Sequence, residues 1–393
     1  MPFAVHVLGL AVFAQGTSEF MLSGLVHDIA GDLRVSIPAV GSLTPAFAVG
    51  MIVGAPLVAL LSLRWPRRGA LLAFLATFFA VHVIGAVTTS FEVLFATRVI
   101  AALANAGFLA VGLATAASLA GPRGKGRATS VLLSGITLAC IAGVPLGAVL
   151  SGFWGWRSAF WAVAAVSVPA LFAILRAVPA TPADPAAPSA RHELRALRTP
   201  RLIVTLVLGA LVNGATFCTF TYLAPVITGA TGLGSGWVPA VLALFGIGSF
   251  VGVTVGGLAD AHPMPLLAVG TSALLVGWLA FVLLAAQPVA ALVLVVVQGM
   301  LSFGVGSTLI TQALYAATDA PTLAGGFATA AFNVGAAAGP ALGGVAFTVG
   351  LGGNRAPLVV SAILVAAALV LGATAYAISR TRATKGPRAP RLG

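Results

Sequence analysis

Long apolar runs dominate this chain of 393 residues and decide what it can fold into. A helix needs about 20 mainly apolar residues to cross the hydrocarbon core of a bilayer. Hydrophobic residues make up 60% of the chain and charged residues only 7%, so the polar gaps between the runs are short. The sequence therefore predicts an all-α membrane protein with twelve transmembrane helices, at 3–27, 38–61, 70–89, 91–119, 129–151, 158–177, 202–225, 237–259, 265–286, 288–316, 322–349 and 356–378.

Basic residues between the runs predict the orientation in the membrane. Loops rich in Lys and Arg stay in the cytoplasm, and most of the 20 Lys and Arg residues fall on one side when both termini are cytoplasmic. Three arginines fall outside under this scheme: Arg34, Arg157 and Arg355. The basic residues that give the net charge of +12 thus set the orientation of the chain in the membrane. We therefore expect no nucleic-acid partner.

The longest polar gap divides the chain into two similar parts. Residues 1–178 form one predicted six-helix half, 179–200 a cytoplasmic linker, 201–380 a second half and 381–393 a basic tail. The pair Gly50 and Gly54 recurs as Gly248 and Gly252. A Gly-Val-Pro-Leu-Gly string at residues 143–147 likewise has a counterpart, Gly-Pro-Ala-Leu-Gly, at 339–343. We therefore expect two pseudo-symmetric halves with a short helical turn late in the linker.

Two charged residues lie well inside the apolar runs. Glu19 is about 12 Å and Arg98 about 10 Å from the outer end of its run, at 1.5 Å per residue. A charge in hydrocarbon is costly, so its default interpretation is functional. Since Arg98 stays protonated at any working pH, we predict that Glu19 carries a proton and that Arg98 acts on it electrostatically. Two structural alternatives remain: Arg98 reaching the outer interface, and Glu19 hydrogen-bonded to Thr17 or Ser23.

Other polar and aromatic residues within the runs are candidates for lining a substrate cavity. Several in the seventh run recur at helical spacing, which places aromatic surface beside hydrogen-bonding groups. Each alone is more often a contact between helices. The candidates are Asn105, Asn213, Thr216, Phe217, Phe220, Tyr222, Gln298 and Ser302. The five histidines show no ligand spacing, and we assign His6 and His82 no role.

The fifth run carries the most specific motif. Small residues allow close helix packing, while a proline removes one backbone hydrogen bond and bends the helix. A bent, tightly packed helix suits a gate in a carrier. The gating and packing candidates are Gly135, Gly143, Pro145 and Gly147, with Gly339, Pro340 and Gly343 in the second half.

These strings resemble the drug:proton antiporters of the major facilitator superfamily. The fifth run is similar to their antiporter motif, and the segment from Gly16 to Ala30 is similar to bacterial chloramphenicol-resistance exporters. The loop residues Gly54, Arg64, Arg67 and Arg68 resemble the superfamily's signature loop, but the acidic residue expected before Arg64 is missing. In the second half Asp260 is retained and its basic partner is missing. The loop's charge-relay role is therefore in question.

The resemblance implies a multi-pass protein of the bacterial inner membrane that exports a small amphipathic drug, chloramphenicol first. It also implies antibiotic resistance, proton motive force as the energy source, no cofactor and a monomer embedded in lipid. The alternative is an efflux carrier for a sugar or nucleoside, although the runs hold few groups for binding hydroxyls.

Other classes of membrane protein fit less well. Neither a metal-ligand cluster nor a nucleophile with a base is recognisable among the eight acids and five histidines, so we expect no enzyme. The segment Gly121–Gly126 lacks the spacing of a nucleotide-binding loop, which argues against an ATP-driven pump. The linker and the paired halves favour a carrier over a channel.

Overall fold

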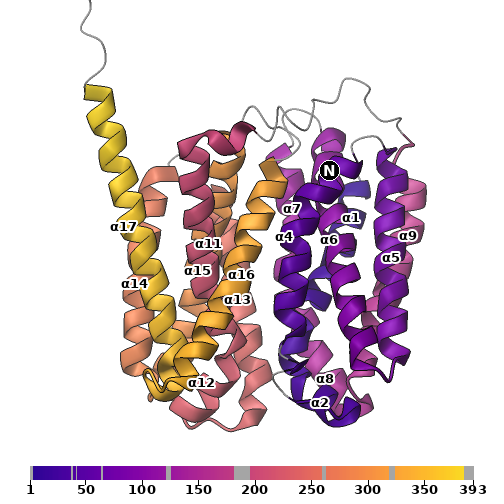
Figure 1. Cartoon of the computed structure of the whole chain (residues 1–393), viewed down its shortest axis with the longest axis horizontal. Helices are drawn as coiled ribbons and strands as arrows, with labels where there is room; N and C mark the ends of the chain where they lie inside the picture. Colours follow the sequence, from indigo (N-terminus) through magenta and orange to yellow (C-terminus); the bar gives the residue numbers. More distant parts are fainter. Residues whose placement is uncertain are drawn as a thin grey trace, which may run out of the picture.

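Helices form every regular element in the described part of the chain. The structure, a computed structural model, describes residues 3–36, 39–40, 42–62, 65–120, 125–180, 195–258, 263–317 and 324–384. Two groups of helices stand side by side, with α4 and α16 at their boundary (Figure 1). The beginning of α1 and the far end of α17 lie on the same face of the bundle (Figure 1). This arrangement agrees with two halves and an even number of crossings.

The N-terminal half follows the predicted runs closely. Its elements are α1 (Phe3–Phe20), η1 (Met21–Gly24), α2 (Val26–Leu33), α4 (Leu43–Ser62), α5 (Arg67–Val87), α6 (Phe91–Ala120), α7 (Lys125–Leu138), η2 (Ala139–Gly143), α8 (Val144–Trp154) and α9 (Arg157–Ala177). In the linker, η3 (Arg195–Arg198) is the predicted helical turn, while 181–194 lie outside the described residues.

The C-terminal half repeats the pattern. Its elements are α11 (Pro200–Thr221), α12 (Leu223–Ala230), η4 (Ser235–Trp237), α13 (Val238–Leu258), α14 (Pro263–Leu284), α15 (Pro288–Ala316), α16 (Ala324–Thr348), η6 (Gly353–Arg355) and α17 (Ala356–Thr384).

Helices occupy the positions of all twelve predicted runs. Ten described helical segments are long and apolar enough to cross a membrane, and Leu43–Gly54 within α4 is a shorter apolar helix. The remaining run contains α1, where Gln15, Ser18 and Glu19 interrupt the apolar sequence near the end of the helix. The side chains fit this placement, since many large apolar residues such as Phe172 and Leu283 are exposed on the outside of the bundle.

Three of the runs are not single α-helices, and of these only the fifth was expected to deviate, at Pro145. The first tightens into η1 after Phe20 and resumes as α2. The seventh breaks at Tyr222, the equivalent place in the other half. The fifth widens into the π-helical turn η2 just before Pro145. Because Pro145 has no N–H, an extra residue in the turn lets the chain bypass the missing hydrogen bond.

Small residues hold neighbouring helices close together in both halves. A Cβ atom added at Gly50 would meet Ala102 of α6, and one added at Gly248 would meet the backbone of α15 at Val296. The repeated glycine pairs therefore make the same contact, between the second and fourth spans of each half, as expected for a duplicated fold.

Candidate functional site

Arg98 is buried in the N-terminal half and is bound to α1. Its side chain is 1% exposed. The guanidinium donates from Nη1 to Ser18 Oγ over 2.7 Å and from Nη2 to the Ser18 carbonyl oxygen over 2.9 Å. It also lies over the ring of Phe47 from α4, 4.6 Å from the centroid. The alternative in which Arg98 reaches the outer interface is therefore wrong.

A histidine completes this contact. His82 of α5 is 1% exposed, its Nε2 lies 2.6 Å from Ser18 Oγ, and its Nδ1 lies 2.7 Å from the Phe78 carbonyl oxygen. A carbonyl oxygen can only accept, so Nδ1 carries the proton. In the neutral ring Nε2 then accepts from the Ser18 hydroxyl. One continuous chain of hydrogen bonds thus runs from Arg98 through Ser18 and His82 to the backbone of α5.

Glu19 follows Ser18 and takes a different partner. Its carboxylate accepts a long hydrogen bond, 3.4 Å, from Asn105 Nδ2 of α6. Thr17 donates instead to the carbonyl of Phe13 in its own helix, so the Thr17 alternative is wrong, and the side chain of Ser23 lies outside the described residues. Arg98 lies close enough to Glu19 to interact with it electrostatically, and the role of the two residues in proton coupling stays a prediction.

The two charges are nevertheless not joined as an ion pair. Among the residues that the structure describes, one acid–base pair lies within 4.0 Å, and it is Arg157 with Asp32. The Glu19 carboxylate therefore lies beside a guanidinium whose Nη groups are engaged by Ser18.

Several buried polar atoms near Glu19 have no partner within the described part of the chain. These atoms are both amide atoms of Gln15, the Oδ1 of Asn105 and the Nε of Arg98. Gln15 lies one helical turn before Glu19 on α1. Because an unsatisfied buried polar group costs roughly 1–3 kcal/mol, such atoms mark a place where a ligand or water has groups to bind.

The motif glycines of the fifth run pack against α1, the helix that carries Glu19. A Cβ atom added at Gly135 would meet the backbone of Gly9 and Phe13, and one at Gly143 would overlap Thr17. Gly147 faces Met21 just beyond the end of α1. The motif therefore positions the first span directly, while η2 supplies the local distortion before Pro145.

An aromatic cluster connects the two halves next to Glu19. Phe20 of α1 stacks on Phe217 of α11 with ring centroids 5.3 Å apart, and meets Phe220 edge-on at 6.4 Å. Phe220 also contacts Phe245 of α13, 4.9 Å away. Two of the predicted cavity residues, Phe217 and Phe220, thus lie where the halves meet, against the ring of Phe20, the residue that follows Glu19.

The other predicted cavity residues make contacts inside the C-terminal half. Asn213 donates to the Phe332 carbonyl of α16 over 2.7 Å, and Thr216 to Val212 of its own helix over 2.8 Å. Tyr222 donates to the Pro340 carbonyl over 3.1 Å. The structure thus joins these side chains to α16 or to their own helix, and their role in the cavity stays a prediction.

Gln298 and Ser302 are buried on α15. Gln298 donates to the Leu274 carbonyl of α14 over 3.2 Å, so it faces α14. Its Oε1 and the Ser302 hydroxyl have no partner among the described residues.

The second-half glycines mirror the first. Gly339 lies against the backbone of Gly214, and Gly343 lies against Cys218 and Tyr222. Pro340 sits inside an unbroken α16, unlike Pro145. The expected packing role thus has a structural basis on both sides.

The signature loop is described only in part. Gly54 packs against Leu103 and Ala106 of α6, and Arg67 and Arg68 begin α5. Arg64 and Asp260 lie outside the described residues, so the proposed relay across this loop stays a prediction.

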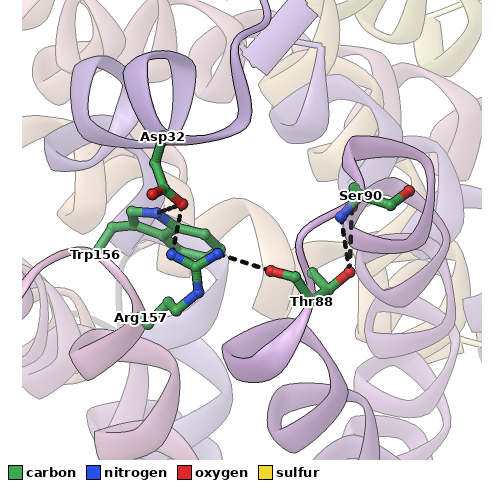
Figure 2. A network of polar contacts seen from close by, with 5 residues as sticks. All are labelled: Asp32, Thr88, Ser90, Trp156 and Arg157. Atoms are coloured by element: carbon green, nitrogen blue, oxygen red, sulfur yellow. Dashed lines mark hydrogen bonds and ion pairs between the residues drawn. The ribbon is translucent and has the colours of Figure 1, made fainter.

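A polar network fastens the N-terminal half at the face opposite the termini. Figure 2 shows Arg157 between Asp32 and Thr88; it donates to the Asp32 carboxylate over 2.5 Å and to the Thr88 carbonyl over 2.8 Å. The Nε1 of Trp156 also donates to Asp32, and the hydrogen bond from Arg157 holds the pKa of Asp32 below its usual value. Asp28 accepts separately from Ser151. Both aspartates therefore have partners of their own, away from Glu19.

Sequence reasoning missed three residues of this site: Gln15, Ser18 and His82. The available signal was the position of His82 within an apolar run, because a buried imidazole needs a hydrogen-bond partner. Which helix supplies that partner depends on helix rotation, and hydropathy does not encode rotation.

Two halves of packed apolar helices, with a half-buried acid and a buried arginine close to where they meet, are typical of a membrane transport protein. The family model of the Major Facilitator Superfamily matches residues 8–325, and the chain belongs to this family. It is a transport protein and not an enzyme.

Three relatives are similar to the chain over most of its length. The chain is 56% identical to a chloramphenicol resistance protein of Streptomyces lividans, over 94% of this chain and 95% of the relative. It is 35% identical to an inner membrane transport protein of Escherichia coli, over 94% and 95%. It is 32% identical to a chloramphenicol efflux pump of Mycobacterium tuberculosis, over 87% and 85%.

A solved structure supports the fold alone. The human organic anion transporter MFSD10 matches with a TM-score of 0.71 at 20% identity, covering 94% of this chain and all of that structure.

Proposed function

We propose that this chain exports small amphipathic drugs, chloramphenicol first among them, and confers resistance by proton-coupled antiport. The observation that carries the proposal is the Glu19 carboxylate, which lies beside Arg98 without an ion pair and next to the contact between the halves. The relatives named for chloramphenicol resistance and efflux support the choice of substrate.

In this scheme the proton binds Glu19 and the drug binds next to it, so that binding of one favours release of the other. A proton arriving from outside neutralises Glu19, which weakens its bond to Asn105 and favours release of the drug outward. Loss of that proton to the cytoplasm restores the carboxylate and resets the carrier. Arg98 keeps its charge throughout, so it favours the deprotonated form of Glu19 without carrying the proton itself.

The aromatic cluster suits the proposed cargo. Chloramphenicol joins a nitrophenyl ring to hydroxyl and amide groups. The rings of Phe20, Phe217 and Phe220 offer apolar surface for its ring, and the unpartnered atoms of Gln15 and Asn105 offer hydrogen bonds. A sugar or nucleoside would need more such groups than this neighbourhood holds, so we place that alternative second.

The location of the chain, its oligomeric state and its orientation in the membrane are also part of the proposal. We infer that the chain lies in the bacterial inner membrane as a monomer, with both termini in the cytoplasm and no cofactor besides the proton motive force. The basic residues of the loops support this orientation, as does the position of the start of α1 and the end of α17 on the same face of the bundle.

The test is accumulation of radiolabelled chloramphenicol in a pump-deficient bacterium that expresses the chain. We expect low accumulation that rises to the level of empty cells when a protonophore is added. Glu19→Gln should raise accumulation to that level without a protonophore, because a neutral amide cannot exchange a proton. The matched control is Glu92→Gln, an acid at the start of α6 that is bound to Ser90, and it should leave transport unchanged. Protonophore-sensitive export by Glu19→Gln would refute the role of Glu19.

A further inference from the structure

We propose that His82 is a positioning residue: acting through Ser18, it holds Arg98 away from Glu19 and thereby sets the pH at which the carrier exchanges its proton. The inference rests on the proposed proton coupling. It assigns a role to a residue of α5, although the described hydrogen bond of Glu19 is to Asn105 of α6. Its basis is the chain of hydrogen bonds from Arg98 to Phe78.

Each link in this chain is short and directional. Ser18 has one hydroxyl proton, and it is given to His82 Nε2 over 2.6 Å. The hydroxyl oxygen is then oriented to accept from Arg98 Nη1 over 2.7 Å. Without His82, the Ser18 proton loses its acceptor and must turn toward another one, such as a backbone carbonyl. The oxygen is then no longer held in the orientation that accepts from Arg98, so the Nη1 bond weakens.

The imidazole is itself held in place. Its Nδ1 donates to the Phe78 carbonyl over 2.7 Å, and its ring contacts the rings of Phe78 and of Phe160 from α9, with centroids 4.1 Å and 5.8 Å away. With both ring nitrogens engaged and two aromatic rings packed against it, His82 presents Nε2 to Ser18 in one orientation. The residue that His82 fixes is the serine that accepts from Arg98, so its orientation bears directly on the guanidinium.

The charged and titratable groups that face His82 determine how it affects Arg98. From α6 it faces Arg98, which acts on it electrostatically, and from α1 it faces Ser18, with Glu19 next in the chain. From α9 it meets the ring of Phe160. The described arginines of α5 and α9 belong to the first and last turns of those helices. A neutral His82 therefore avoids placing a second cation next to Arg98.

Release of Arg98 has a definite consequence for Glu19. Nη2 keeps its bond to the Ser18 carbonyl, but an Nη1 that has lost the Ser18 hydroxyl has the neighbouring carboxylate as its best alternative partner, since charge-assisted pairs are the stronger ones. Pairing stabilises the carboxylate, so a more acidic solution is needed to protonate the carrier. We therefore expect the transport–pH profile to shift by about one pH unit toward acid. This is the smallest of the shifts, about 1 to 3 units, that a carboxyl group shows when it gains an arginine neighbour.

The experiment is chloramphenicol transport by the purified full-length protein in proteoliposomes, measured against external pH. His82→Leu removes both hydrogen bonds and should shift the pH of half-maximal transport by about one unit toward acid. His82→Gln should keep the wild-type profile, because its carbonyl oxygen can accept from Ser18 while its amide donates to Phe78. His6→Leu is the matched control, a histidine exposed on α1.

A second variant guards against loss of folding in His82→Leu. Ser18→Ala removes the central hydroxyl, and Ser18→Thr retains it, so the first should shift the profile and the second should not. Wild-type profiles for His82→Leu and Ser18→Ala would overturn the proposal. Equal loss at every pH in His82→Leu and His82→Gln would also overturn it, since that is the result for a purely structural residue. Absence of proton-driven transport by the wild type would instead refute the proposed function.

Discussion

At the scale of single residues, the charges of this protein divide into two kinds with different surroundings. Glu19 and Arg98 lie among packed helices, where each needs specific partners and where a proton changes the local interactions most. Asp32 and Arg157 form an ion pair at the surface, on the face of the bundle opposite the start of α1, with side chains 45% and 31% exposed. This outer pair fastens α2 to α9 and to the turn before α6, whereas Glu19 and Arg98 are not joined as an ion pair.

The outer pair predicts a stability contribution with a defined pH window. Because the pKa of Asp32 is lowered in the folded protein, its contribution is fully present above the unfolded value, near 3.9, and is lost as the pH falls through the folded value. Arg157→Gln should therefore lower the thermal unfolding midpoint by a constant amount between pH 5 and 8. The gap to the wild type should narrow only below about pH 4.

The control for this prediction is Arg355→Gln. Arg355 lies near the outer end of the other half and donates to the Val282 carbonyl over 3.0 Å, and a carbonyl does not titrate. Its effect on the unfolding midpoint should not change across the acid range. A wild-type advantage over Arg157→Gln that varies between pH 5 and 8 would contradict the assignment of the pair.

At the scale of helices, hydropathy predicts the spans well and their interruptions poorly. The apolar runs have the length that a bilayer requires, so their positions follow from composition alone. The break at Tyr222 does have a signal in the sequence, because Pro225 has no N–H to donate to the Thr221 carbonyl at the end of α11. No proline accompanies the break after Phe20, and hydropathy does not mark it. Pro145 did signal its distortion. The depth of Glu19 and Arg98 was predictable from counting residues, but the choice of Ser18 and Asn105 as partners was not.

The contact between α1 and the motif helix predicts a sensitive glycine. Gly143→Ala places a methyl group into the Thr17 side chain, and overpacking of this kind costs about 1–3 kcal/mol. We expect a lower unfolding midpoint in detergent and reduced transport, because α1 carries Glu19. Gly152→Ala is the matched control, since nothing lies within 4 Å of its added Cβ.

A compensating change makes this prediction specific. In the second half Gly339 faces Gly214, so a glycine on each side of the contact is an arrangement that this fold tolerates. Thr17→Gly should therefore restore much of the transport lost in Gly143→Ala. If Gly143→Ala behaves like Gly152→Ala in both assays, the close contact does not control α1.

At the scale of the whole molecule, the two halves share one architecture and differ in chemistry. The repeated glycines make equivalent contacts in each half. By the offset of the glycine pairs Gly50/Gly54 and Gly248/Gly252, Phe217 takes the place of Glu19. The N-terminal half therefore holds the carboxylate, and the C-terminal half contributes most of the aromatic surface. Coupling then requires the halves to move against each other, and Phe20 on Phe217 is a contact that such a motion must open.

Locking that contact should stop transport. Phe20→Cys with Phe217→Cys, in a chain whose buried Cys140 and Cys218 are replaced by Ala, can be joined by a short reducible bifunctional thiol reagent. The control pair is Trp65→Cys with Phe74→Cys, whose rings lie 6.0 Å apart within one half. We expect transport in proteoliposomes to stop on cross-linking the first pair, to return on reduction, and to persist in the cross-linked control. Continued transport with Phe20 and Phe217 positions joined would mean that the halves move about a different contact, because a covalent bridge across this one forbids its opening.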